Sequence, residues 1–149
     1  VYDRLEADLA KAILSINAVK AFELGSGFAM SAGRASVFND AILSADTRHW
    51  TSLQTLTNHS GGIQGGISNG QPLWFKAGFK ATATVAIPQQ SVDFQGKAVT
   101  LQAHGRHDPC VVPRAVPVVE AMMALVIADH VLGWPAAQLS VLLKSLARP

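Results

Sequence analysis

One stretch decides the fold of this chain: Gln71-Pro72-Leu73-Trp74-Phe75-Lys76-Ala77-Gly78-Phe79-Lys80-Ala81-Thr82. Its odd-numbered positions from 73 to 79 are apolar, and the even-numbered positions from 74 to 80 include two lysines. This period of two indicates a β-strand with one covered face. Residues 98–104 alternate in the same way, after a turn near residues 95–96. We therefore expect residues 71–82 and 98–104 to pair as antiparallel neighbours.

Helical patterns flank these strands on both sides. Residues 3–16 predict an amphipathic helix, and Asp3 followed by Glu6 has the form of a capping box. A strand over 18–24 follows and ends in a glycine turn over 25–27. A second helix is expected over 114–132, and a last helix from Pro135 to about residue 147. This order of elements predicts an α+β fold, with an antiparallel sheet packed on helices.

The segment 28–58 has no clear periodicity and is rich in Ser, Thr, Asn and Asp. A loop of that length inside a compact domain is usually functional or mobile. We expect it to be a loop, and to be mobile in the absence of a ligand.

Composition limits the function classes. The chain has 149 residues, of which 49% are hydrophobic and 15% charged, and its net charge is +2. That length fits one domain, and the apolar excess predicts that part of the surface meets another chain or domain. The small charge argues against nucleic acid or an anionic membrane as a partner. A lone cysteine, Cys110, excludes an internal disulfide and favours a reducing compartment.

The most apolar stretch, residues 115–128, is shorter than the roughly 20 residues of a membrane span, so we expect a buried helix. The chain opens with Val1-Tyr2-Asp3 and lacks an initiating methionine. We therefore expect it to start inside a longer polypeptide, with any targeting segment out of view.

Gly105-Arg106-His107-Asp108-Pro109-Cys110 concentrates a guanidinium, an imidazole, a carboxylate and a thiol. Pro109 favours extended backbone at Asp108, which places Arg106 and Asp108 on one face. The adjacent cation would lower the pKa of Asp108 and keep it ionised as a potential base. A structural ion pair explains the same pattern, and the hexapeptide alone does not separate the two interpretations.

The second candidate segment is Asn58-His59-Ser60-Gly61-Gly62-Ile63-Gln64-Gly65-Gly66-Ile67-Ser68-Asn69-Gly70. Its five glycines let backbone N–H groups approach an anion or a flat ring. It matches neither a P-loop, because Gln71-Pro72 stands where Lys-Ser/Thr is required, nor GxGxxG. Taken alone, it favours a tight structural turn.

Other polar side chains carry weaker signals. Lys80 beside Thr82 and Thr84 is suited to phosphate, but these residues alone favour a solvated strand end. The five histidines have no metal-ligand spacing. Cys110 lacks the flanking signature of a nucleophile, so we expect a small buried side chain.

Three blocks, in order along the chain, resemble the chorismate synthase family. The first runs from Leu5-Glu6-Ala7-Asp8-Leu9-Ala10-Lys11-Ala12 to Ile16-Asn17-Ala18-Val19-Lys20, and the second is the glycine-rich segment 58–70. The third runs from the hexapeptide through Val111 to Arg114-Ala115-Val116-Pro117 and Glu120-Ala121-Met122. The resemblance spans nearly all of residues 1–149 and identifies them as the C-terminal portion of such a domain. The family's N-terminal portion, with its catalytic histidines, lies outside this chain.

The resemblance implies a phosphate lyase, a carbon–oxygen lyase of the shikimate pathway and aromatic amino-acid biosynthesis. Members convert 5-enolpyruvylshikimate 3-phosphate to chorismate and phosphate by 1,4-elimination. They need reduced FMN, without net redox change, and only bifunctional members would use NADPH. Members of the family are homotetramers with helices between antiparallel sheets. The resemblance implies a cytoplasmic location and leaves a plastid location open. On its own, the 149-residue chain would be an inactive assembly or partial flavin-binding module.

The resemblance also implies roles for individual residues. Asp108 matches the aspartate that removes the ring proton together with the flavin, and Arg106 matches an arginine at the flavin and substrate anions. The remaining flavin contacts match Asn17, Ala18, Gly65, Lys80, Ala81, Thr82, Ala83 and Thr84. The chain departs from the family at Ala81, where proline is common, and this weakens the contacts assigned from Ala81 to Ala83.

Overall fold

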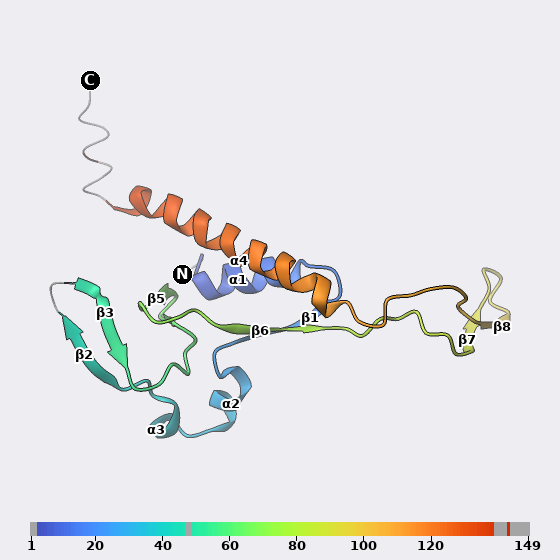
Figure 1. Cartoon of the computed structure of the whole chain (residues 1–149), viewed down its shortest axis with the longest axis horizontal. Coiled ribbons are helices and arrows are strands. Elements are labelled where there is room, and N and C mark those ends of the chain that lie inside the picture. The colour runs from blue at the N-terminus through green and yellow to red at the C-terminus, as the bar shows by residue number, and fades with distance from the viewer. Residues whose placement is uncertain (1–2, 47–48, 139–142, 144–149) are drawn as a thin grey trace.

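The computed structural model describes residues 3–46, 49–138 and 143. In chain order the elements are α1 Leu5–Leu14, β1 Val19–Leu24, α2 Gly27–Ala32, α3 Ala35–Phe38, β2 Ile42–Asp46, β3 His49–Thr55, β4 Ile63–Gln64, β5 Ile67–Ser68, β6 Phe75–Phe79, β7 Gln89–Val92, β8 Ala98–Leu101, α4 Val112–Gly133 and the 3₁₀ helix η1 Trp134–Ala137. Helices and small antiparallel sheets confirm the α+β class. Figure 1 shows α1 beneath α4, with the β7–β8 hairpin projecting at one end.

The decisive stretch forms β6, with its alternation as predicted. Phe75, Ala77 and Phe79 are half-buried, whereas Lys76 and Gly78 are exposed. The prediction that this strand pairs with residues 98–104 was wrong. β6 pairs antiparallel with β1, with Leu24 opposite Phe75, while β8 pairs with β7 across the turn over residues 93–96. Alternation marks a strand's covered face but carries no information on which strand lies beside it.

A cross-strand ion pair accompanies the β1–β6 pairing. Glu23 lies opposite Lys76, and the Lys76 ammonium is 2.6 Å from the Glu23 carboxylate. The hydrogen bond from Lys76, together with one from the Phe28 backbone N–H, holds the pKa of Glu23 below its usual value.

Helix α1 provides half of the buried apolar side chains among the described residues. Leu5, Leu9 and Ile13 are buried one turn apart, as the helical spacing predicted. Fully burying such a side chain contributes roughly 1.5–3 kcal/mol. The predicted capping box does not form: the N-cap is Arg4 without a side-chain cap, and Glu6 pairs with Arg4 instead.

Helix α4 begins two residues earlier than predicted, with proline in its first turn, and Pro117 is accommodated within it. Met123, Val126 and Ile127 pack against the α1 core, and the His130 imidazole lies 2.9 Å from the Asp8 carboxylate. The expectation of a buried helix was wrong, because Ala115 is the one buried residue among Val112–Gly133. Helix α1 covers only one face of α4, so the other apolar side chains of α4 are left partly or fully exposed.

At 22 residues, α4 is long and apolar enough to cross a membrane, so the predicted shortfall in length was also wrong. One such helix is weak evidence for a span, since core helices of soluble proteins share its length and composition.

Two further segments differ from expectation. The predicted loop over 28–58 contains α2, α3 and the antiparallel β2–β3 hairpin. Side-chain hydrogen bonds and hairpin pairing order polar segments that lack periodicity, so composition underestimated the structure here. After Gly133 the chain forms η1 to Ala137, and most of the last predicted helix lies outside the described residues.

Candidate functional site

Two of the predicted flavin-binding segments meet where β1 begins and β6 ends. Val19 lies opposite Phe79, and the Lys80 backbone N–H donates to the Ala18 carbonyl at 2.7 Å. Asn17, Ala18 and Lys80 are all exposed there. Ala18 has φ +68°, a left-handed conformation that costs an alanine about 1 kcal/mol. The fold thus holds a strained, solvent-facing backbone beside a lysine, a feature often found at functional sites.

Beyond Lys80, two extended segments enclose a cavity of about 370 Å³. The outgoing segment contributes Thr82 and Thr84, and the returning segment contributes His107 and Asp108. The Thr82 hydroxyl donates to the Pro109 carbonyl at 3.4 Å, which ties the two segments together. The structure therefore gathers hydroxyls, an imidazole and the predicted base around one space of ligand size.

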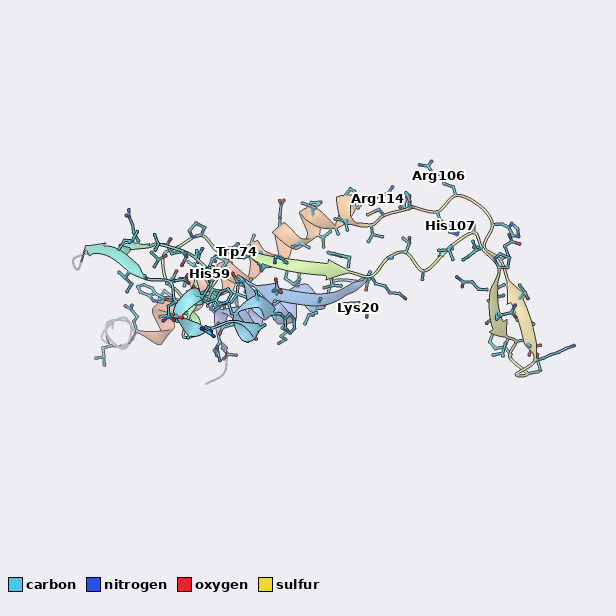
Figure 2. All side chains as sticks on the ribbon, turned by 90° about the horizontal axis from the view of Figure 1, so that it is seen from below. Lys20, His59, Trp74, Arg106, His107 and Arg114 are labelled. Atoms are coloured by element: carbon cyan, nitrogen blue, oxygen red, sulfur yellow. The ribbon has the colours of Figure 1, made fainter. Side chains whose placement is uncertain are left out.

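The partner of Asp108 differs from the prediction. The Arg114 guanidinium Nη1 lies 2.7 Å from Asp108 Oδ2, and the side chains are 77% and 41% exposed. Arg106, predicted to be that partner, projects outward from the returning segment (Figure 2). The prediction relied on Arg106 and Asp108 sharing one face of an extended segment. The chain instead turns into α4 after this segment, and Arg114 in the first turn of α4 pairs with the Asp108 carboxylate.

Sequence reasoning missed Arg114 as a site residue, although an arginine in the first turn of the helix after Asp108 was visible. It also passed over Lys20, which is exposed in β1 two residues after Ala18 (Figure 2). Such a lysine on an alternating strand gives no local signal of a site.

Gly65 does not join the other predicted residues. It lies in the turn between β4 and β5, and the neighbouring Gly66 carbonyl accepts a hydrogen bond from Leu5 N–H at the start of α1. Asn17 follows the opposite end of that ten-residue helix, which is about 15 Å long. Gly65 has φ +62° and open space where a Cβ would stand, so its backbone is accessible to a ligand.

The rest of the glycine-rich segment is the tight turn predicted for it. Asn58 accepts a hydrogen bond from Gly62 N–H and donates one to the Pro72 carbonyl, each at 2.8 Å. The Trp74 indole N–H donates to the Asn58 carbonyl at 2.9 Å. Gly61 has φ +69°, and a Cβ there would lie 2.7 Å from the Trp74 oxygen.

Asp40 anchors this turn from outside. Oδ1 accepts hydrogen bonds from the Thr57 hydroxyl at 2.8 Å and the His59 N–H at 2.7 Å. Oδ2 accepts one from the Ser60 N–H at 2.9 Å. Partial burial opposes ionisation, but these hydrogen bonds outweigh it and lower the pKa of Asp40. Asp40 gave no sequence signal, because its partners lie at least 17 residues away.

Cys110 is exposed, not buried as predicted, because it lies in the extended segment before α4. A larger cavity of about 500 Å³ between α1, β5 and α4 is lined mainly by apolar side chains, with His130 and Ser68 among them. It contains none of the predicted residues, so the smaller, more polar cavity is the candidate site.

These features define an α+β protein with a cavity between two extended segments that is lined in part by hydroxyls, an imidazole and a carboxylate. The family model described as Chorismate synthase matches residues 1–132. The chain belongs to the chorismate synthase family, which confirms the resemblance drawn from its three sequence blocks.

Relatives agree with this assignment. The chain is 58% identical to a chorismate synthase of Synechococcus sp. (strain CC9605) over 132 residues, covering 89% of this chain and 35% of the relative. It is 58% identical to one of Opitutus terrae (strain DSM 11246 / JCM 15787 / PB90-1) over 130 residues, covering 87% and 35%. A solved structure described as Crystal Structure of Chorismate Synthase aligns with TM-score 0.57 and 28% identity, covering 85% of this chain and 29% of that one. The chain spans about a third of the length of these relatives.

Proposed function

We propose that the complete protein carrying this chain is a chorismate synthase, a lyase that converts 5-enolpyruvylshikimate 3-phosphate to chorismate and phosphate. The observation that carries the proposal is that Ala18 contacts Lys80, which lies two residues before the segment that lines one cavity together with Asp108. Family membership supports the substrate and the reaction class.

The described residues fit an FMN site in their chemistry. Lys80 is an exposed cation, Thr82 and Thr84 provide hydroxyls at the cavity, and open space faces Gly65. Lys80, Thr82 and Thr84, with Asn17, Ala18, Ala81, Ala83 and Arg106, would hold the cofactor. The family resemblance assigns Gly65 to the same site, although Gly65 lies at the opposite end of α1 from Asn17. Bound reduced FMN would supply the electron-rich ring that the elimination needs, without net redox change.

Within this chain, the proposed chemistry centres on Asp108. Its carboxylate accepts the ring proton, and the electron pair of that C–H bond forms a new ring double bond. The existing ring double bond shifts, and the carbon–oxygen bond to phosphate breaks with its electron pair leaving on the phosphate. Lys80 and Arg106 provide positive charge for the anions of substrate and cofactor. Because the chain spans a third of its relatives, the groups that protonate or orient the rest of the substrate would come from the remainder of the protein.

The test is chorismate formation by the complete protein under anaerobic conditions, with FMN reduced by dithionite so that the assay does not depend on NADPH. Asp108→Asn should lower kcat by about 10²–10⁴-fold, the usual contribution of a general base. Asp93→Asn is the matched control, because Asp93 lies in the β7–β8 turn away from the cavity. Normal turnover by Asp108→Asn would remove the assigned base.

A second candidate concerns the 149-residue chain by itself: a non-catalytic assembly or partial flavin-binding module. The uncovered apolar face of α4 favours it. Titration of the isolated chain with FMN, followed by the same assay, distinguishes the two candidates, and turnover by the isolated chain would contradict the second. We further propose that the complete enzyme is a cytoplasmic homotetramer. Sedimentation of the full protein would check the number of subunits, and cell fractionation would check the location.

A further inference from the structure

Arg114 is held in place by the start of α4. It is the third residue of that helix, and its backbone N–H donates to the Val111 carbonyl at 3.1 Å. Its helical backbone restricts the directions that the side chain can take. The Cα and Cβ of Arg114 are therefore held relative to the segment 103–109 that lines the cavity, and the guanidinium is placed by its ion pair with Asp108.

The Asp108 carboxylate is held from the other side. Pro109 restricts the backbone of Asp108, and the pair between Arg114 Nη1 and Asp108 Oδ2 at 2.7 Å has the length of a charge-assisted hydrogen bond. With Oδ2 engaged by a cation, Oδ1 is the oxygen that can accept a proton. A planar guanidinium also constrains the plane of the carboxylate more than a lysine ammonium would.

This pair contributes little to folding. Exposed ion pairs have small effects on stability, and the Arg114 side chain is 77% exposed. Catalysis is far more sensitive, because a misplacement of about 1 Å at a reacting group can cost about 100-fold in rate.

We propose that Arg114 is a positioning residue that orients Asp108 for proton removal, while Arg106 serves the ligand anions. This inference rests on the proposed function, in which Asp108 is the base. It assigns the two arginines of the C-terminal block to different tasks, which sequence alone had combined at Arg106.

The experiment compares Arg114→Ala, Arg114→Lys and Arg106→Ala in the complete enzyme, with steady-state kinetics, FMN titration and melting temperature. Arg114→Ala should lower kcat about 30- to 100-fold, with KM and FMN affinity changed by less than about twofold. Arg114→Lys should retain an intermediate kcat. Arg106→Ala should mainly raise KM or weaken FMN binding.

Chemical rescue separates positioning from a merely structural role. Added guanidinium at low millimolar concentration should raise kcat of Arg114→Ala by about tenfold, without raising that of the wild type or of Asp108→Ala. Unchanged kcat in Arg114→Ala, a loss confined to KM or FMN affinity, or absence of rescue would overturn the inference. If Arg114→Ala does not fold, a wild-type kcat in Arg114→Lys overturns it as well.

Wild-type turnover separates this inference from the proposed function. A wild-type enzyme that forms no chorismate overturns the proposed function and this inference with it. Turnover by the wild type, combined with wild-type kinetics in the Arg114 variants, overturns the inference alone.

Discussion

Asp40→Asn should loosen the glycine-rich turn, because both oxygens of the Asp40 carboxylate are used. Oδ1 binds the Thr57 hydroxyl and the His59 N–H, and Oδ2 binds the Ser60 N–H. Asparagine has one amide oxygen and an NH₂ group. Whichever way the amide is oriented, at least one of these donors must face another donor.

The expected magnitude follows from these contacts. Loss of the charge-assisted bond to Ser60 N–H costs about 1.5–3 kcal/mol. The two remaining bonds become neutral ones, at a further cost of about 0.5 kcal/mol each. Because Asp40 is only half-buried, water offsets part of this, and we expect a net loss of about 3 kcal/mol.

The assay is amide hydrogen exchange, which reports local opening at the Ser60 N–H. A loss of about 3 kcal/mol should accelerate exchange there by about 100-fold. Asp93→Asn is the matched control: Asp93 Oδ1 alone accepts the Gln95 and Lys97 N–H groups, so one amide oxygen can replace it. The argument is that Asp40 needs two acceptor oxygens and Asp93 only one. Equal acceleration of exchange by the two substitutions in their respective turns would refute it.

The same contacts predict a pH dependence. The folded state lowers the pKa of Asp40 below its ordinary value of 3.8, because hydrogen bonds favour the carboxylate more than burial disfavours it. The resulting stabilisation is complete above the unfolded pKa and is lost as pH falls through the lower, folded pKa. Protection of Ser60 N–H in the wild type should therefore decline below about pH 4, whereas the already weaker protection in Asp40→Asn should vary less.

Two further substitutions probe the core and the glycine turn. Leu9→Ala should lower the free energy of unfolding by about 2–5 kcal/mol, because Leu9 is fully buried, whereas Leu14→Ala, 48% exposed on the same helix, should cost under about 1 kcal/mol in urea titration. Similar losses at both positions would contradict the assigned core. Gly61→Ala combines positive φ with a 2.7 Å contact and should cost about 3 kcal/mol, whereas Gly65→Ala has positive φ alone and should cost about 1 kcal/mol while weakening FMN binding in titration. A Gly65→Ala variant with wild-type FMN affinity would remove Gly65 from the cofactor site.

Several elements could be predicted because their signals are local. Leu5, Leu9 and Ile13 recur at helical spacing, and the alternation of β6 marks its covered face. Errors arose where a distant partner decides the outcome. Asp40 in the predicted loop over 28–58 accepts hydrogen bonds from Thr57, His59 and Ser60. The capping box failed for a local reason, because Glu6 pairs with the neighbouring Arg4.

The hexapeptide shows the same division at the candidate site. Its residue types and their order, together with two other blocks, carried the family assignment without any coordinates. Neither those residues nor their spacing could reveal that Arg114 is the cation beside Asp108, because the chain turns into α4 between them.

By itself, the sequence determined the α+β class, the main helices, the alternating face of β6 and the family. Each depends on residue type and spacing along the chain. Only the tertiary structure decided that β1 pairs with β6, that Asn17 and Ala18 lie beside Lys80, that Gly65 lies apart from them and that Arg114 holds Asp108. The physical reason is that strand pairing and ion pairing depend on which groups the folded chain brings within contact distance, and many pairings satisfy the same local pattern.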